Sequence, residues 1–159
     1  MTLESPVPQW MLPKVWTWMC QFSEFMVDDF TPKNYAEMEA KHFSDLCNRR
    51  TKEFAILDNG FPVGAVWCER IEDTDVFAGH LVFERDYPEK IRATKKALAI
   101  MFDSGVQSIV WLSLSTNRPF LIFLRRLKAQ IKDTLPKGTV LHGQSVPVVV
   151  AVSTRESIQ

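Results

Sequence analysis

The feature that most constrains the fold is a strand, a helix and a second strand in succession in the middle of the chain. The first strand, VFAGHLVFER at 76–85, is broken by the step Tyr87-Pro88. A helix ending near Gly105 follows, marked by apolar residues at helical spacing: Ala97, Leu98, Met101 and Phe102. VQSIVWLSLS at 106–115 is then near-continuously apolar, which predicts a strand buried on both faces. This order implies a right-handed parallel crossover.

The segment before this unit predicts paired strands. Residues 53–71 (EFAILDNGFPVGAVWCERI) have the pattern of strand, turn and strand. Asn59-Gly60 can adopt the positive φ angles that a tight hairpin turn needs. A second polar turn follows at 72–75, so residues 58–85 are predicted to form an antiparallel meander.

Two helices are predicted upstream of the meander. The first carries apolar residues at helical spacing: Val15, Trp18, Met19, Phe22, Phe25 and Met26. The acidic pair at 28–29 ends it, and Thr31 is a candidate N-cap with Pro32 at the first position of a second helix. One side of that second helix is lined by Tyr35, Met38, His42 and Leu46. It ends at Asn48-Arg49-Arg50, whose two cations suit a helix C-terminus.

The last predicted helix, 118–129, lies in the stretch STNRPFLIFLRRLKA. It begins after Asn117, whose side chain can cap a helix start at a strand exit. Its basic end forms a solvated face that complements the helix dipole: Arg125, Arg126 and Lys128. Beyond it, residues 139–153 predict closing strands around a turn at Gly143.

These elements predict a mixed α/β domain with an antiparallel meander, a parallel βαβ crossover and helices on both faces of the sheet. The 159 residues, 46% of them hydrophobic, suffice for one domain over 1–159, with an irregular lead-in at 1–12 and a tail at 154–159. A formal net charge of zero argues against a general nucleic-acid binder. Residues 81–159 nevertheless hold 12 Lys and Arg against 6 Asp and Glu, which could offer a local anion site.

The cysteines and the amino-terminal segment indicate the compartment. Cys20, Cys47 and Cys68 are odd in number and form no CxxC pair, which suits buried free thiols in a reducing compartment. No basic n-region is present and prolines interrupt the early apolar stretches, so neither a signal peptide nor a membrane span is expected. We expect a cytoplasmic protein. No metal site is predicted, because no ligands cluster around the histidines His42, His80 and His142.

The order of elements over about residues 10–153 resembles the GNAT superfamily, the GCN5-related N-acetyltransferases. The family often carries a strand ending in Asn and then a helix patterned N-x-x-A-I-x-L-Y-x-x-L-G-F. Those places are held here by Asn117, Phe120, Leu121, Phe123, Leu124, Leu127, Lys128 and Ala129. The apolar phase agrees, but Leu124 replaces the family's Tyr and Lys128 its Gly. The chain also looks like divergent GNAT-like proteins of bacteriophages, some of them virion core proteins, which would place it in a host cytoplasm or a virion.

The resemblance implies an acyl-CoA cofactor, most directly acetyl-CoA. The family binds its pyrophosphate on backbone N–H groups at a helix N-terminus, through the motif R/Q-x-x-G-x-G/A. The corresponding loop at 87–94 has no glycine, and Ile91 and Ala93 stand at the two small positions. Cations in the loop compensate in part for the missing glycines, because they can meet phosphates as point charges. The alternative to cofactor binding is a polar helix start with a solvated basic face. The implied cofactor contacts are Val82, Phe83, Lys90, Ile91, Arg92, Ala93 and Asn117.

Acyl transfer to an amine needs a base for the amine proton and an acid for the leaving thiolate. In GNAT proteins the base often sits on the strand before the cofactor loop, where this chain has His80 and Glu84. Residues four apart in a strand point to the same face, which is usable for water-mediated deprotonation. The alternatives are a hydrogen-bonded structural histidine and a surface glutamate. Leu124 cannot supply the proton that the family's Tyr would supply.

Two functions remain open at this level. An N-acyltransferase acting on a small-molecule or protein amine would show a V-shaped gap between strands 76–85 and 107–116. A non-catalytic protein of the same fold, such as a phage virion, assembly or interaction component, would have that gap closed by bulky residues: Phe83, Ile91 or Trp111. Aromatic residues available for a partner surface are Trp10, Trp16 and Trp18. The sequence does not determine the oligomeric state.

Overall fold

The computed structural model describes residues 1–22, 32–72 and 74–159, and this part of the chain contains a seven-stranded mixed sheet. The strands lie in the order β1-β2-β3-β4-β5-β7-β6. Their bounds are β1 Thr2–Glu4, β2 Thr51–Asp58, β3 Phe61–Arg70, β4 Val76–Phe83, β5 Ser108–Leu114, β6 Gln130–Leu141 and β7 Gln144–Thr154. The predicted end of the first helix and the Thr31 cap lie outside the described residues.

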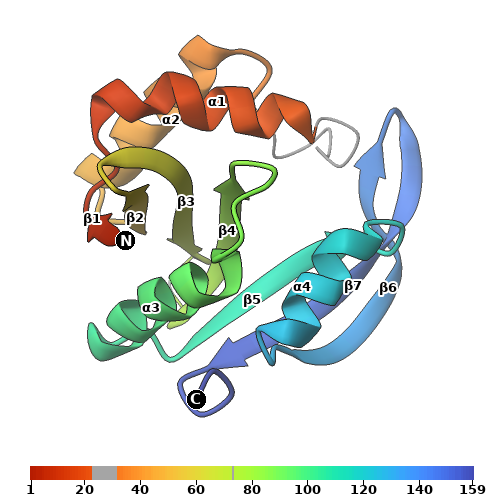
Figure 1. Ribbon diagram of the computed structural model, residues 1–159. Helices are drawn as coiled ribbons and strands as arrows, with labels where there is room; N and C mark the ends of the chain where they lie inside the picture. Colours follow the sequence, from red (N-terminus) through yellow and green to blue (C-terminus); the bar gives the residue numbers. More distant parts are fainter. Residues whose placement is uncertain (23–31, 73) are drawn as a thin grey trace.

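Helices cover both faces of this sheet, as predicted (Figure 1). On one face lie a short 3-10 turn, η1 (Gln9–Met11), and the helices α1 (Leu12–Gln21) and α2 (Tyr35–Cys47). On the other face lie α3 (Lys90–Asp103) and α4 (Arg118–Arg126). None of the helices in the described part of the chain is long and apolar enough to cross a membrane.

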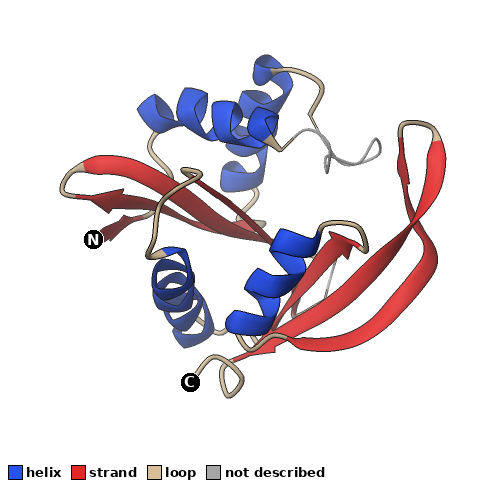
Figure 2. Ribbon diagram, turned by 45° about the vertical axis from the view of Figure 1, so that its right-hand side comes forward, coloured by secondary structure: helices blue, strands red, loops and turns tan. Residues whose placement is uncertain are grey.

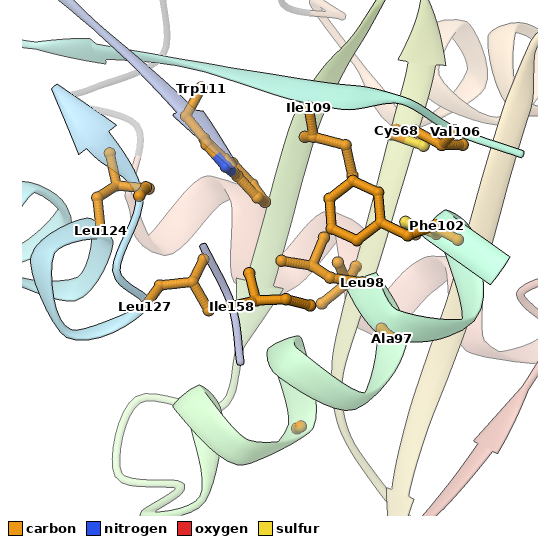
Figure 3. Close-up of a cluster of buried hydrophobic side chains, with 14 of the residues drawn as sticks. Cys68, Ala97, Leu98, Phe102, Val106, Ile109, Trp111, Leu124, Leu127 and Ile158 are labelled. Atoms are coloured by element: carbon orange, nitrogen blue, oxygen red, sulfur yellow. The ribbon is translucent and has the colours of Figure 1, made fainter. Parts of the chain in front are cut away.

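Each face has its own hydrophobic core, because successive residues of a strand point to opposite sides. Ala55 of β2 packs on the α1–α2 side with the fully buried Trp18, whereas its neighbour Ile56 packs on the α3–α4 side. Figure 3 shows the second core, where side chains of α3, β5 and the α4 segment meet: Leu98, Phe102, Ile109, Trp111, Leu124 and Leu127. The two cores fix the strands between the helical layers.

The central prediction of strand pairing is confirmed. β2, β3 and β4 form an antiparallel meander, and β4 pairs with β5 in parallel after the crossover through α3. Asn59 and Gly60 turn the first hairpin with φ angles of 50° and 82°. His142 and Gly143 turn the last hairpin in the same way, with φ angles of 49° and 74°.

Several predicted boundaries were wrong. The lead-in contains β1, which is too short to show a strand pattern, and Ile158 of the predicted tail packs into the core. β6 begins at Gln130, nine residues before the predicted start at residue 139. Its first nine residues are all exposed and mostly polar, so they lack the alternation by which half-buried strands are recognised. Figure 2 shows the long β6–β7 hairpin extending away from the rest of the sheet.

The start of α2 also differs from the prediction. The helix begins at Tyr35, and the side chain of Asn34 caps it by accepting a hydrogen bond from the amide of Glu37 at 2.9 Å. The amide of Lys33 in turn donates to the carboxylate of Glu37 at 2.8 Å. This reciprocal arrangement satisfies two amides at the helix start. Pro32 therefore lies before the helix and not at its first position.

β5 is not buried on both faces, in contrast to the prediction. Ile109 and Trp111 are fully buried on the α3–α4 side, but Leu112 is 58% exposed on the opposite side. The reason is tertiary, because among the described residues α1 packs against β3 and β4. Continuous apolar character along a strand therefore does not require a layer on each face.

The cysteines also depart from expectation in part. Cys68 is buried, and burial raises the pKa of its thiol to about 12. Cys20 and Cys47 are exposed, because the buried stripe of α1 passes through Leu12, Val15 and Trp18 and Cys47 is the last residue of α2. The rule that thiols pack inside holds here for one of the three.

Candidate functional site

The two strands of the parallel crossover separate after three rungs. Val76, Phe77 and Ala78 of β4 pair with Ser108, Ile109 and Val110 of β5, and beyond them the two strands share no pairing. Both strands nevertheless continue, β4 to Phe83 and β5 to Leu114. This splay is the V-shaped divergence that the acyltransferase interpretation predicted.

Along β4, the backbone N–H and C=O groups of successive residues point alternately toward β3 and toward β5. This alternation, called the bonding phase, shows which backbone groups face the splay. The amide of Glu84 donates to the carbonyl of Val63 at 2.9 Å, and the carbonyl of Val76 accepts from Ile71 at 2.9 Å. Even-numbered residues of β4 are therefore bonded to β3, and odd-numbered residues point toward β5. Beyond the last rung, the backbone groups of Leu81 and Phe83 face the open side.

This phase separates two residues that the sequence interpretation had grouped. The backbone of Phe83 is available at the splay, whereas that of Val82 is committed to β3, and the side chain of Val82 is buried under α1 and α2. The backbone of Leu81, and not that of Val82, faces the splay beside Phe83. The sequence contained no signal for this choice, because bonding phase depends on the register between β3 and β4.

The N-terminus of α3 follows the splay and has no side-chain cap. Glu89 precedes the helix without capping it, and the first turn carries no acidic residue. Ala93 is fully buried and Ile91 is half-buried, so the smaller of the two side chains is the one packed inward. Free N–H groups at the positive end of the helix dipole favour an anion there.

Lys90 and Arg92, the two cations predicted to contact the cofactor, each make a local contact at this helix start. The Lys90 ammonium donates to the carbonyl of Arg85, and partial burial lowers the pKa of Lys90. Arg92 is exposed and pairs with Glu89 at 3.3 Å. Neither cation is locked in a deep site, so both can turn toward an anion at the cost of weak surface contacts.

Thr94, one turn into α3, is a candidate that the sequence interpretation missed. Its side chain is fully buried, and its Oγ1 has no hydrogen-bond partner among the described residues. A buried hydroxyl without a partner costs stability, so such a group is a candidate contact for a polar ligand. The only sequence signal was its position directly after Ala93.

Large aromatic side chains crowd the α3–α4 side of the splay. Phe83 is 3% exposed and stacks on Tyr87, with ring centroids 6.1 Å apart. Trp111 is fully buried, donates from its indole nitrogen to Ser153 at 2.9 Å and meets Phe120 edge to face. Of the three bulky residues that the non-catalytic interpretation named, Phe83 and Trp111 are buried and Ile91 is half-buried.

The opposite side of the splay carries Glu84, just beyond the end of β4. The indole nitrogen of Trp18 donates to its carboxylate at 3.0 Å, and the ammonium of Lys14 lies 3.3 Å from the same oxygen. These two contacts hold the pKa of Glu84 below its ordinary value. The carboxylate is therefore ionised at neutral pH, and its side chain is 44% exposed.

His80 points to the same face as Glu84, as the spacing predicted, but its surroundings are different. Its ring stacks on Trp67 with centroids 5.3 Å apart, and its buried Nε2 has no hydrogen-bond partner among the described residues. Burial has the largest effect and lowers its pKa, while Glu69 raises the pKa and Lys41 lowers it further, each by a smaller amount. His80 is thus a neutral imidazole at pH 7, half-buried beside Trp67.

Asn117 takes the structural role that the sequence interpretation offered first. Its side-chain oxygen accepts from the amide of Phe120 at 3.2 Å and caps α4. Trp10 remains a surface aromatic at 59% exposure, whereas Trp18 belongs to the interior and supports Glu84. Among the described residues, no group of acidic, His and Cys side chains could hold a metal ion.

The protein has the mixed α/β fold of the GNAT acetyltransferases, as comparison with solved structures shows. Spermidine N-acetyltransferase SpeG of Vibrio cholerae, solved as a point mutant, superposes with a TM-score of 0.82 at 12% identity over 98% of this chain and 96% of that chain. Mycobacterium smegmatis RimJ in complex with CoA-disulfide gives 0.77 at 12% identity, over 97% and 81% of the two chains.

A third solved structure, the ribosomal-protein-S5-alanine acetyltransferase of Vibrio fischeri, gives a TM-score of 0.70 at 10% identity over 99% of this chain and 94% of that chain. SpeG has also been solved in complex with CoA and spermine. No family model and no curated protein matches this sequence. The likeness is therefore one of fold, carried by the sheet order and the crossover and not by sequence identity.

Proposed function

We propose that this protein is an acyl-CoA-dependent N-acyltransferase that transfers an acyl group to an amine, with acetyl-CoA as the donor. The observation that supports this most is the splay, where β4 and β5 part after the rung of Ala78 and Val110. It leaves unpaired backbone groups beside a helix N-terminus. Such an arrangement has no structural purpose within the sheet, because a continued ladder would satisfy more backbone groups.

The residues at the splay fit a long ligand that carries amides at one end and phosphates at the other. The free backbone of Leu81 and Phe83 can bond ligand amides as a neighbouring strand would. The uncapped start of α3, with Lys90 and Arg92, suits a pyrophosphate. The half-buried Ile91 narrows the backbone approach in comparison with glycine, so we expect weaker binding than a glycine-rich loop would give.

A bound acyl-CoA supplies an activated acyl group as a thioester. The chain's own contribution comes from the face opposite the aromatic cluster. The ionised carboxylate of Glu84 is exposed enough to attract an ammonium group and to orient a water molecule. His80, held neutral by burial, has an unpartnered nitrogen that can accept a proton. We propose Glu84 as the amine-binding group and His80 as the base.

The acceptor that we propose is a small-molecule amine. SpeG, which shares the fold, is a spermidine N-acetyltransferase. The ribosomal-protein-S5-alanine acetyltransferase of Vibrio fischeri shares it as well, which keeps a protein amine as the next acceptor to test. We propose a cytoplasmic location for this reaction.

The second candidate function is that of a non-catalytic protein of the same fold, for example a phage virion or assembly component. Three features favour it: Pro88 in the cofactor loop, Ile91 at the first glycine position, and the buried aromatic rings of Phe83 and Trp111. Under this candidate the splay persists as a remnant of the fold, and the protein works through its surface.

Calorimetric titration with acetyl-CoA separates the two candidates. The enzyme predicts saturable binding in the micromolar range that is lost in Lys90→Glu and in Arg92→Glu. Lys132→Glu is the matched control, because it makes the same charge change at an exposed position on β6. Absence of heat at millimolar acetyl-CoA would end the enzyme proposal in favour of the second candidate.

A further inference from the structure

The first half of β2 has no partner strand on its outer side within the described chain. β1 pairs with β2 along Ala55–Leu57 alone. The amide of Arg70 donates to the carbonyl of Arg50 at 2.8 Å, which sets the bonding phase of β2 against β3. By this alternation, the backbone groups of Thr51 and Glu53 point away from β3. No backbone partner for these groups is found among the described residues, and Glu53 itself is 5% exposed, with its carboxylate accepting from the amide of Val7 at 2.8 Å.

A cavity of about 230 Å³ lies along this edge. Leu46 lines it from α2 on one sheet face, and Ile100 and Met101 line it from α3 on the other. Ile100 is 40% exposed. Pro6, where the chain crosses from β1 toward η1, lines the cavity too. The free edge thus forms part of a groove with apolar side chains from both helical layers.

Two further observations indicate what the groove accepts. The Oγ1 of Thr51, which lines it, is buried and has no hydrogen-bond partner among the described residues. Three cations gather where α2 ends and β2 begins, at Arg49, Arg50 and Lys52. In the described part of the chain none of the three is in an ion pair. Lys52 lines the groove itself, and so does Glu53, whose carboxylate accepts from the Val7 amide at 2.8 Å and lies 3.3 Å from His42. The groove therefore offers hydrogen-bonding groups, with a cluster of positive charge at the end where α2 meets β2.

We propose that this groove binds an extended acidic peptide segment of a partner protein, which adds to the sheet as a short strand beside Thr51–Phe54. The free backbone groups recur every second residue, which matches an extended chain and not a helix. Alternate side chains of the peptide would face Leu46 on one side and Ile100 on the other. Its carboxylates would pair with the three cations. At about 3.4 Å per residue, the edge accommodates about four peptide residues.

This site is separate from the splay, because β3 lies between β2 and β4. Neither the proposed acyl transfer nor its absence bears on it. Titration of ¹⁵N-labelled full-length protein with the blocked peptide Ac-Glu-Val-Glu-Val-NH₂ tests it. We expect saturable chemical-shift changes at Thr51–Phe54, at Leu46 and at Ile100, with a sub-millimolar Kd. Acetyl-CoA added to the sample should leave these changes in place.

Two peptides serve as controls on the chemistry. The same sequence with N-methylated backbone amides keeps its side chains but loses its donors, and it should bind at least about tenfold more weakly. The lysine counterpart, Ac-Lys-Val-Lys-Val-NH₂, should bind more weakly as well, because it repels the cations. Equal binding by either control peptide would overturn the proposal.

Two variants test the location. Ile100→Asp should weaken binding at least about tenfold, whereas Ile122→Asp should not, because Ile122 is a similarly exposed isoleucine on α4. Thr51→Pro removes an outward-facing N–H and leaves the β2–β3 ladder intact, so it should weaken binding without unfolding the protein. Absence of any localised shift with the acidic peptide at millimolar concentration, or unchanged binding to Ile100→Asp, would refute the site.

Discussion

The indole nitrogen of Trp18 donates a hydrogen bond to the carboxylate of Glu84 across 66 residues of sequence, at 3.0 Å. This bond ties α1 to the end of β4, at the mouth of the splay. Trp18 is fully buried, whereas Glu84 stays partly exposed, so the core positions a charged group at the surface. The carboxylate is held in place from the side of the sheet opposite to the proposed cofactor contacts.

We predict that Trp18→Phe raises the pKa of Glu84 toward its ordinary value of 4.5. The substitution keeps most of the buried ring but removes the donor, which is the largest of the effects that hold this pKa down. NMR titration of the Glu84 side chain would measure the change. Trp16→Phe is the control, because Trp16 lies on the same helix and should leave the Glu84 titration unchanged. An unaltered pKa in Trp18→Phe would show that Lys14 alone sets it.

We predict that the protein loses stability as the pH falls below 6.5, and that His80 contributes to this loss. Burial keeps the pKa of folded His80 below its ordinary value of 6.5, so the unfolded chain binds this proton at a higher pH. Stability from the neutral imidazole is complete above 6.5 and declines from there toward the lower pKa of the folded state. Denaturant unfolding measured at a series of pH values would show the slope.

The variant His80→Gln isolates this contribution. Glutamine does not titrate in this range, so the slope of unfolding free energy against pH below 6.5 should become flatter. Stability at neutral pH is compared separately, since loss of the Trp67 stacking lowers it at every pH. A slope identical to that of the parent protein would exclude His80 as the titrating group.

We predict that Gly79→Ala destabilises the protein by about 1–3 kcal/mol through overpacking. A Cβ at this position would lie 2.6 Å from Ile109 Cγ2 and 2.7 Å from the ring of Trp111. Both neighbours are fully buried, so neither can move away freely. Chemical denaturation would measure the loss. Combination with Ile109→Ala should cost less than the sum of the two single changes, and strict additivity would contradict the steric explanation.

We predict that Lys128→Gly stabilises the protein by roughly 1 kcal/mol, because Lys128 has a φ of 65° at the end of α4. The amide of Lys128 bonds to Arg125 and that of Ala129 bonds to Leu124, a helix ending in which glycine is favoured. Lys128→Ala is the control, since it removes the ammonium bond to Gln159 but keeps the Cβ. Greater stability in Lys128→Ala than in Lys128→Gly would contradict the backbone explanation.

The sequence determined the local elements and their order. Asn59-Gly60 predicted a hairpin turn, and Pro88 predicted the end of a strand. The apolar spacing from Ala97 to Phe102 predicted a helix. Each of these signals depends on residues close together in the chain. The parallel crossover followed from that order. Those local signals were enough to place His80 and Glu84 on one face of β4.

Only the tertiary structure determined which side chains and backbone groups contact the candidate site. Trp18 reaches Glu84 through the packing of α1 on the sheet, and the register of β3 against β4 exposes the backbone of Leu81 instead of Val82. Leu112 lies open because the α1 layer reaches β3 and β4, as seen in the described residues. These outcomes depend on contacts between segments far apart in the chain. Local pattern carries no information about them, since it records which residues can be buried but not which partners bury them.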